Sequence, residues 1–208
     1  KAALSDLGEV VVVMHGTTND DICTIHRGTK VRKMHTSRRD AFQTIGDEIA
    51  GTVTYPSLEV SLASHAVKRG TNELALMDKL EEKCAIVWYY PGMDPAILSA
   101  WKGYRGIVLV GTGLGHVGTH MVGSIREMSK AGTTFVMVSQ CLHGRVCDRV
   151  YDTGRDLLSA GVIEGEDMLP EVALVKLMWV LGNSSSQEEV RRMMGSNLAG
   201  EIKWRSSE

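Results

Sequence analysis

The feature that most constrains the fold of this chain is a regular alternation of short apolar runs and helical patterns between residues 84 and 139. The apolar runs are rich in β-branched residues, as buried strands are. In order, the pattern predicts a strand at 84–89, a helix at 95–102, a strand at 105–110, a helix at 119–131 and a strand at 133–139. Strands that are joined by helices run parallel, so this part of the chain predicts a small parallel sheet with helices on its faces.

Two further helices are predicted beyond this alternation. The first covers residues 170–181 and stops at Gly182, since glycine is the commonest residue just past a helix end. The second covers residues 186–194, and Ser186 stands three residues before Glu189, which is the spacing of a capping box.

The amino-terminal part has a different texture. The run at residues 10–14 is short and β-branched, which is typical of a strand buried on both faces of a parallel sheet. Residues 19–36 are polar and basic and predict mostly loop with short strands, and residues 40–45 predict a brief turn of helix. Residues 70–82 are polar without a strand pattern and suit a surface linker.

This linker divides the expected α/β fold into two domains. Residues 1–78 are expected to be the remainder of an amino-terminal parallel-sheet domain, because the chain starts at Lys1 without methionine and soon enters a core strand. Residues 79–208 are expected to form a small α/β domain of their own.

Composition excludes several classes of protein. A chain of 208 residues with 43% hydrophobic side chains can bury a sizeable core. A formal net charge of −2 argues against binding of nucleic acid by bulk attraction. The cysteines lack the spacing of a disulfide framework and predict reduced thiols in a cytoplasmic protein. No apolar run approaches the length of about 20 residues that a membrane helix needs.

A glycine-rich string between a strand and a helix, Gly113 to Gly118, matches the dinucleotide-binding fingerprint. The next strand ends at residues 138–140 without the carboxylate that would bind the ribose. The structural interpretation, a turn that packs closely at the ends of the strands, is therefore favoured over a cofactor site.

Histidines and cysteines offer a second candidate site. His116 and His120 have the four-residue spacing of zinc ligands, and Cys141, His143 and Cys147 form another loose group. His116 lies in the glycine-rich loop before the helix begins, and the residues between the two histidines include no glutamate. The second group has no further Cys pair to close a tetrahedron, so packing and hydrogen-bonding roles are predicted, with no metal and no cofactor.

The segment at residues 30–42 is different in kind. It places lysines among hydroxyls, a histidine and an aspartate directly after a sheet edge, where open α/β sheets carry their active sites. Crowded positive charges disfavour the protonated form of one lysine, which could then act as a base. A basic surface loop that is solvated or contacts phosphate explains the same composition, and composition leaves both interpretations open.

Several strings in the chain resemble the asparaginase family of amidases. Val-Val-Val-Met-His-Gly is followed by Lys33, Thr36 and Phe42 in the pattern of a strand that leads to a catalytic lysine. Longer strings resemble in particular the D-subunit branch of the archaeal glutamyl-tRNA(Gln) amidotransferases; they lie at residues 28–42, 90–94, 111–117, 151–157 and 166–179. The resemblance covers nearly the whole chain.

The resemblance implies hydrolysis of a side-chain amide through a threonine-linked acyl-enzyme. It carries Lys33 over as the catalytic lysine, which polarises an aspartate and a threonine. Positions at the rim of the site or against the substrate are His35, Thr36, Tyr90 and Asp94. The family's two nucleophile strings, Thr-Gly-Gly-Thr and Thr-Asp, do not occur here. We therefore expect a fragment that lacks the nucleophile and is inactive alone.

The resemblance also implies partners. Glutamine is the expected source of ammonia, and the E subunit of the amidotransferase, which uses ATP and Mg²⁺, is expected to convert Glu-tRNA(Gln) to Gln-tRNA(Gln). A homodimer through the flavodoxin-like carboxyl-terminal domain is expected as well. The alternatives are a free-standing L-asparaginase that releases aspartate and ammonia, a binding module without activity, and an NAD-dependent oxidoreductase that rests on the glycine-rich string alone.

Overall fold

The computed structural model describes residues 1–71 and 73–204, and the chain divides into two compact units. Unit 1 spans Lys1–Ala75, and unit 2 begins at Leu76. The predicted boundary lay slightly later, after residue 78. Each unit has its own sheet and its own apolar core.

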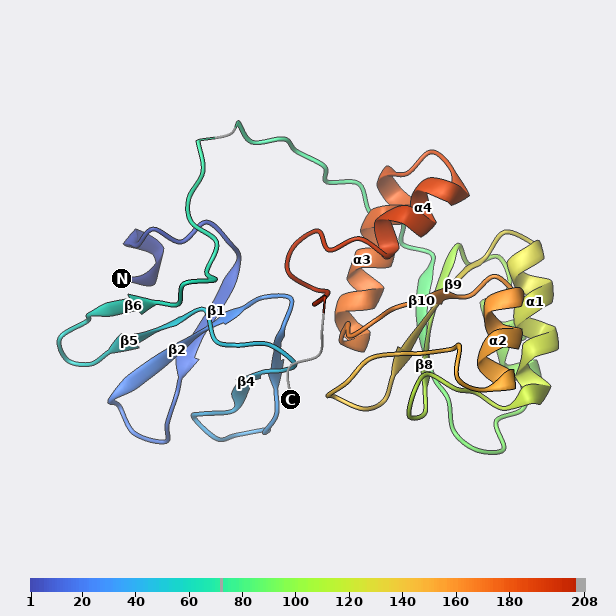
Figure 1. Ribbon diagram of the computed structural model, residues 1–208, viewed down its shortest axis with the longest axis horizontal. Coiled ribbons are helices and arrows are strands. Elements are labelled where there is room, and N and C mark those ends of the chain that lie inside the picture. The colour runs from blue at the N-terminus through green and yellow to red at the C-terminus, as the bar shows by residue number, and fades with distance from the viewer. Residues whose placement is uncertain (72, 205–208) are drawn as a thin grey trace. The chain divides into compact units, whose positions relative to one another are not determined.

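Unit 1 contains a four-stranded sheet, ordered β1-β2-β5-β6, in which every neighbouring pair is antiparallel (Figure 1). The strands are β1 (Val11–His15), β2 (Ile22–Arg27), β5 (Gly51–Thr54) and β6 (Val60–Leu62), and they follow a short 3₁₀ helix, η1 (Ala2–Leu4). A separate two-stranded ribbon pairs β3 (Val31–Lys33) with β4 (Phe42–Thr44). The buried core of unit 1 is small and consists of Ile25, Ala50, Val53 and Ala66.

The predicted strand at residues 10–14 is confirmed as β1, but its predicted environment is wrong. β1 pairs antiparallel with β2, and Val13 in its middle is 37% exposed rather than buried on both faces. Only residues 16–21 join the two strands, whereas a parallel pair needs a crossover of about a dozen residues. The short connection therefore makes a hairpin of this segment.

The basic stretch that follows contains β2 and β3, so the prediction of short strands within loop is confirmed. The turn of helix predicted at residues 40–45 is wrong, because this segment forms β4. Phe42 and Thr44 pair with Lys33 and Val31 across the ribbon. An aromatic and a β-branched residue at alternate positions suit a strand better than a helix.

A partly buried ionic cluster joins distant parts of unit 1. Arg27 Nε donates to Glu9 Oε2 at 2.6 Å, and Arg27 Nη1 donates to Asp47 Oδ2 at 3.0 Å. The second oxygen of Glu9 accepts a hydrogen bond from Val67 N at 2.9 Å. Burial opposes the charged form of Glu9, but the bonds from Arg27 and Val67 outweigh it and leave the pKa lowered. The beginning, middle and end of the unit are thus joined through one arginine.

Unit 2 has a fully parallel sheet, ordered β10-β9-β8-β7, as the alternation of strands and helices predicted. The strands are β7 (Cys84–Trp88), β8 (Gly106–Gly111), β9 (Thr134–Ser139) and β10 (Ile163–Glu164). The helices are η2 (Pro95–Trp101), η3 (Thr119–Met121), α1 (Val122–Lys130), α2 (Asp152–Ser159), α3 (Pro170–Asn183) and α4 (Gln187–Met194). The α/β fold class is therefore confirmed, and α2 and β10 are additions that were not predicted.

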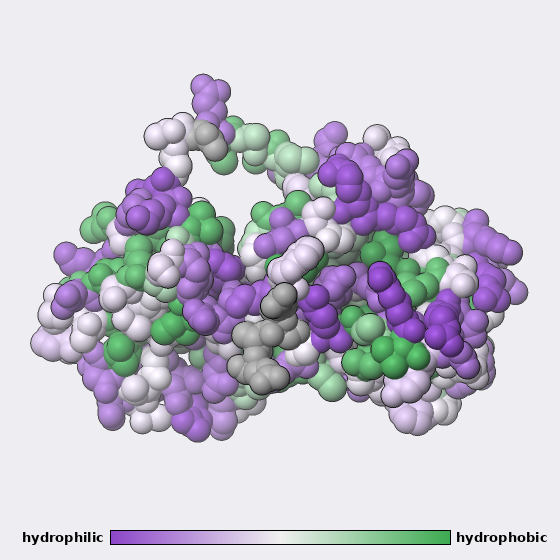
Figure 2. All heavy atoms as spheres, in the orientation of Figure 1, coloured by the Kyte–Doolittle hydropathy of each residue, from purple (hydrophilic) through white to green (hydrophobic). Residues whose placement is uncertain are grey.

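Helices cover both faces of this sheet (Figure 1). Ile107 of β8 packs in one core with Ile125 of α1 and Leu157 of α2. Val108, the next residue along β8, packs in the other core with Leu177 of α3. Successive residues of a strand point to opposite faces, which is why every residue of β8 is buried. On the outer side, hydrophilic residues gather over α4 (Figure 2).

Gly182 was predicted to stop the first carboxyl-terminal helix, but it lies inside α3, which continues to Asn183. A Cβ atom at residue 182 would stand 2.6 Å from Lys79 O, so glycine lets the linker backbone lie directly on the helix. Asn183 Nδ2 and Trp179 Nε1 donate to Lys79 O and Met77 O, each at 2.8 Å. The end of the predicted linker is therefore docked on α3.

The predicted cap of one helix is confirmed. Ser186 caps α4, and its hydroxyl accepts a hydrogen bond from Glu189 N at 3.2 Å. The Glu189 carboxylate in turn accepts from Ser185 N at 2.8 Å. The predicted helix at residues 95–102 is present as the 3₁₀ helix η2.

Across residues 1–71 and 73–204, the helices are too short and not apolar enough to cross a membrane.

Candidate functional site

Lys33 lies at the end of β3, where the ribbon opens into the loop that leads to β4. It pairs with Phe42, and the ribbon closes beyond it through a hydrogen bond from Met34 N to Ala41 O at 2.6 Å. The Lys33 side chain is exposed. Within residues 1–71 and 73–204 its ammonium group forms no hydrogen bond or ion pair, so it is available to a group that approaches the ribbon from solvent.

The loop beyond Lys33 is ordered by its own side chains. His35 Nδ1 accepts hydrogen bonds from Ser37 N and Arg38 N, both at 3.1 Å, and so closes a tight turn. Arg38 donates to both carboxylate oxygens of Asp40, at 2.8 and 2.6 Å. These hydrogen bonds hold the pKa of Asp40 below its usual value. His35 thus shapes the loop, and Thr36 is exposed at its tip.

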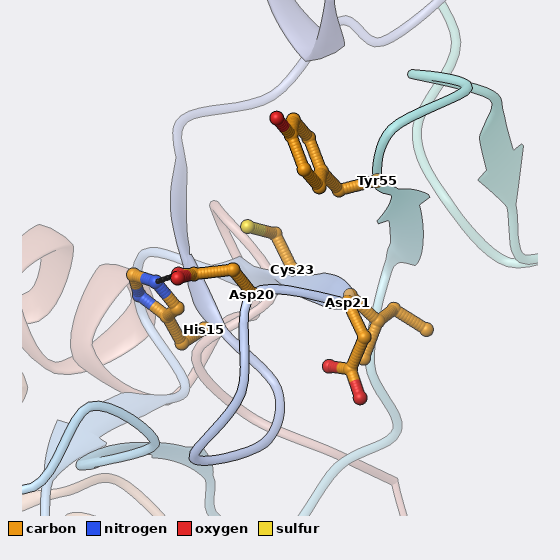
Figure 3. Close-up of a pocket in the computed structure, with 6 residues that line it drawn as sticks. His15, Asp20, Asp21, Cys23 and Tyr55 are labelled. Carbon is orange, nitrogen blue, oxygen red and sulfur yellow. Dashed lines mark hydrogen bonds and ion pairs between the residues drawn. The ribbon is translucent and has the colours of Figure 1, made fainter.

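A pocket of about 360 Å³ opens at the turn between β1 and β2 (Figure 3). It is lined by His15, Asp20, Asp21, Ile22, Cys23 and Tyr55. His15 Nε2 and Asp20 Oδ1 face each other at 3.1 Å, and Arg39 Nη1 donates to the same oxygen at 2.7 Å. The bond from Arg39, followed by that from His15, lowers the pKa of Asp20. Through Arg39, the loop that follows Lys33 is attached to this pocket.

The residues that line this pocket were not predicted as site residues from the sequence. His15 ends β1 and Asp20 stands in the polar hairpin connection that follows, and composition does not distinguish such residues from an ordinary solvated turn. Arg38 pairs with Asp40, and Arg39 pairs with Asp20. The positive charge that sequence crowds around Lys33 is partly neutralised by adjacent carboxylates.

Two buried polar residues, Lys30 and His26, lie next to the β3–β4 ribbon. Lys30 was expected in a basic surface loop, but it is 0% exposed. Its backbone accepts a hydrogen bond from Ile45 N at 2.8 Å. His26 of β2 is 3% exposed, and its Nδ1 lies 2.8 Å from Thr44 Oγ1 of β4. Burial lowers the pKa of His26, so the neutral ring is favoured.

The two rim positions expected in unit 2 have different surroundings. Asp94 caps the helix η2, and its carboxylate accepts a hydrogen bond from Ala96 N at 2.8 Å. Tyr90 is 53% exposed. A structural role is evident for Asp94, while much of Tyr90 is accessible to solvent. A role for either residue at the rim stays a prediction.

The glycine-rich string has the packing role that was favoured for it. Gly115 has a φ of +102°, and a Cβ atom there would stand 2.7 Å from Val146 Cγ1. His116 stacks edge-on against Tyr151 at a ring distance of 5.2 Å, and His120 Nε2 lies 2.9 Å from Met93 O. Among the residues that the structure describes, no three His, Cys, Asp or Glu side chains are grouped to hold a metal ion.

One buried acid in unit 2 was not anticipated. Asp148 is 0% exposed, and neither carboxylate oxygen has a hydrogen-bond partner in the described chain. Its backbone N–H donates to Glu164 Oε1 at 3.0 Å. Burial, with the nearby Glu164 carboxylate as the second cause, raises the pKa of Asp148 to about 7. The acid is therefore largely protonated below neutral pH.

This raised pKa predicts a pH-dependent stability. The carboxyl ionises near pH 3.8 in the unfolded chain and only near 7 in the folded one, so its contribution is fully present below about pH 4 and is lost as pH rises through 7. Asp148→Asn, which mimics the protonated acid, is expected to raise the free energy of unfolding by roughly 2 to 4 kcal/mol at pH 8 and to change it little at pH 4.5.

Urea unfolding at the two pH values measures this difference. Asp156→Asn is the matched control, because Asp156 is exposed on the neighbouring helix α2. A gain in stability for Asp148→Asn that is the same at both pH values would contradict the assignment of the buried charge.

Two family models match this chain. The model of the glutaminase/asparaginase C-terminal domain matches residues 83–194, and that of the asparaginase N-terminal domain matches residues 1–66. Together they take in parts of both compact units.

Curated archaeal relatives carry one shared description. The D subunit of the glutamyl-tRNA(Gln) amidotransferase of Archaeoglobus fulgidus is 57% identical over 204 residues, and that of Pyrococcus horikoshii is 53% identical over 205 residues. Each comparison covers 97% of this chain but only 48% and 47% of the relative. The chain therefore spans about half the length of the curated relatives it matches.

Solved structures agree with this relationship. The thermostable L-asparaginase from Thermococcus kodakarensis matches with a TM-score of 0.78 at 34% identity, covering 86% of this chain and 55% of that one. L-asparaginase I from Vibrio cholerae matches with a TM-score of 0.76 at 26% identity over the same shares.

Proposed function

Because the chain belongs to the glutaminase/asparaginase family, we propose that it forms the Lys33-bearing part of an amidase subunit that releases ammonia from glutamine for the conversion of Glu-tRNA(Gln) to Gln-tRNA(Gln). The observation that carries the proposal is the 57% identity to an amidotransferase D subunit across 97% of this chain. The exposed position of Lys33 at the end of the ribbon is consistent with it.

The chemistry of amide hydrolysis explains the role given to Lys33. A hydroxyl nucleophile loses its proton as it attacks the amide carbon, and the leaving ammonia gains one, so a group that accepts and returns a proton speeds both steps. In this proposal Lys33 polarises the aspartate and threonine that take part in this proton transfer, and it does so from a ribbon whose loop is held by Arg39 and Asp20. The threonines and aspartate that the family adds to the lysine are not found here as Thr-Gly-Gly-Thr or Thr-Asp.

A chimera tests this function directly. In it, this chain replaces the region of the A. fulgidus D subunit that it matches, so the remainder of the site comes from the relative. We expect ammonia release from glutamine by the chimera and none by the 208-residue chain alone. A folded chimera that releases no ammonia from glutamine or asparagine would refute the amidase assignment.

A second candidate is a free-standing L-asparaginase, and the match to the T. kodakarensis enzyme favours it. The two functions differ in their dependence on a partner. Brisk hydrolysis of asparagine by the chimera, unchanged when the E subunit and Glu-tRNA(Gln) are added, would support the asparaginase. Stimulation of glutamine hydrolysis by those partners would support the amidotransferase.

The proposal includes an assembly. The E subunit of the amidotransferase is the partner that would receive the ammonia, and unit 2 would form the contact between two copies. Sedimentation of the chimera, alone and with the E subunit, measures both associations. A chimera that sediments as a monomer at micromolar concentration would remove the homodimer from the proposal and leave the amidase untouched.

A further inference from the structure

The ribbon that presents Lys33 is a separate element of unit 1. Among the residues that the structure describes, β3 and β4 pair only with each other and do not join the four-stranded sheet. An isolated two-stranded ribbon is at best marginally stable in water. Its position therefore depends on the contacts that attach it to the sheet.

One attachment lies at the base of the ribbon. Lys30 N donates to Arg27 O at 3.0 Å, and Lys30 O accepts from Ile45 N at 2.8 Å. These bonds tie the two ends of the ribbon to each other and to the end of β2.

The second attachment is made by side chains. His26 Nδ1 on β2 lies 2.8 Å from Thr44 Oγ1 on β4. Thr44 pairs with Val31, and Phe42, two residues along the strand, pairs with Lys33. Directly paired residues and residues two apart share one face of a ribbon, so Thr44 and Lys33 lie on the same face. The hydrogen bond thus fixes the tilt of the face from which Lys33 projects.

The choice of histidine at this position needs a reason beyond stability. His26 is 3% exposed, and its Nε2 has no hydrogen-bond partner in the described residues. An unpaired buried nitrogen costs free energy that an apolar side chain would not cost. The bond that the ring makes to Thr44 is the contact that an apolar residue could not supply.

We propose that His26 and Thr44 are positioning residues for Lys33, and that their hydrogen bond holds the β3–β4 ribbon in one orientation on the sheet. This inference rests on the proposed amidase function, in which Lys33 must meet the reacting groups at a defined place. Neither residue touches the substrate in this proposal. Both act through the ribbon.

The test compares two substitutions at Thr44 in the chimera. Thr44→Val keeps the shape and removes the hydroxyl, and we expect kcat to fall about tenfold to a hundredfold while KM stays within about twofold. Thr44→Ser keeps the hydroxyl, and we expect kcat within about threefold of the unsubstituted protein. Thr52→Val makes the same chemical change on β5, outside the ribbon, and should leave both constants unchanged.

A second measurement does not depend on activity. In the 208-residue chain, hydrogen exchange of the Met34 amide, which bonds to Ala41 O, reports opening of the ribbon. We expect Thr44→Val to speed this exchange about tenfold or more, with the amides of β8 in unit 2 unaffected. The same comparison can be made at His26. His26→Leu removes the polar atom that bonds to Thr44 and should speed the exchange, whereas His26→Asn keeps a polar atom near the place of Nδ1 and should speed it less.

The outcomes separate the two claims. If the unsubstituted chimera is inactive, the amidase function fails, and the exchange experiment still tests the attachment of the ribbon. If the chimera is active but Thr44→Val and His26→Leu retain its kcat, the positioning role is overturned. A loss of activity that Thr44→Ser shares with Thr44→Val overturns it as well, since the hydroxyl would then be irrelevant.

Discussion

Lys33→Met in the chimera is expected to lower amide hydrolysis about a hundredfold to ten-thousandfold, the range for loss of a group that moves protons in the transition state. Methionine has nearly the length of lysine but cannot accept or donate a proton. Because the Lys33 side chain is exposed and makes no bond in the described chain, the fold does not depend on its charge. The midpoint of urea unfolding should therefore stay nearly unchanged.

A matched control is Lys68→Met, which removes an exposed lysine from the same unit at a distance from the ribbon in sequence. Lys33→Arg keeps the positive charge but replaces the compact ammonium group by a larger, planar guanidinium, so it should be about as inactive as Lys33→Met. Activity of Lys33→Met within tenfold of the unsubstituted chimera would show that the role carried over from the family does not apply here.

Lys176→Met is expected to destabilise the protein by about 3 to 5 kcal/mol, because it leaves a buried carboxylate without its partner. Lys176 Nζ and Glu201 Oε1 lie 2.6 Å apart, and the two side chains are 6% and 3% exposed. The ammonium group also donates to Met194 O at 3.0 Å and to Ser196 O at 2.5 Å. One lysine of α3 thus holds the end of α4 and the segment that follows it.

Glu201 is bound from its other side as well. Its carboxylate accepts hydrogen bonds from Leu198 N at 2.9 Å and from Ala199 N at 2.6 Å. Burial opposes the charged form of Glu201, but the bonds from Lys176 and these amides outweigh it and leave the pKa lowered. The carboxylate therefore stays ionised at neutral pH, and its burial without Lys176 is costly.

Urea unfolding of a double-mutant cycle measures this pair. Lys176→Met combined with Glu201→Gln should be less destabilising than Lys176→Met alone, since the second change removes the unpaired charge. Lys102→Met is the control, because Lys102 is exposed in unit 2. Additive effects of the two single substitutions would show that the side chains do not depend on each other.

Local sequence patterns were sufficient to predict most helices and strands of unit 2. The alternation of apolar runs and helices predicted three strands of the parallel sheet within about two residues at each boundary. Ser186 and Glu189 likewise predicted the start of α4, because a capping box depends on residues close in sequence. Helix α2 was missed, although its string of residues supported the family resemblance, because Gly154 interrupts its helical pattern.

Unit 1 shows where local patterns fail. A run of valines suits a buried parallel strand or one strand of a hairpin equally well, and the short connection that follows decided between them. Lys30 and Lys33 are both lysines in one basic string, yet Lys30 is fully buried and Lys33 is exposed. The pairing register of β3 with β4, and the attachment of this ribbon to β2, determine that Lys30 is buried and Lys33 is exposed.

The sequence by itself determined the α/β class, the order of most elements in unit 2 and the family, since each of these depends on short strings and local periodicity; the catalytic role of Lys33 stays a prediction from the same strings. The tertiary structure alone decided which polar groups meet or are buried: the contact of His26 with Thr44, the hydrogen bond from Arg39 to Asp20, the pair of Lys176 and Glu201, and the buried Asp148 carboxyl, which has no hydrogen-bond partner in the described chain. Burial and hydrogen bonding between residues distant in the chain are properties of the packed fold, and no local pattern of residue types encodes them.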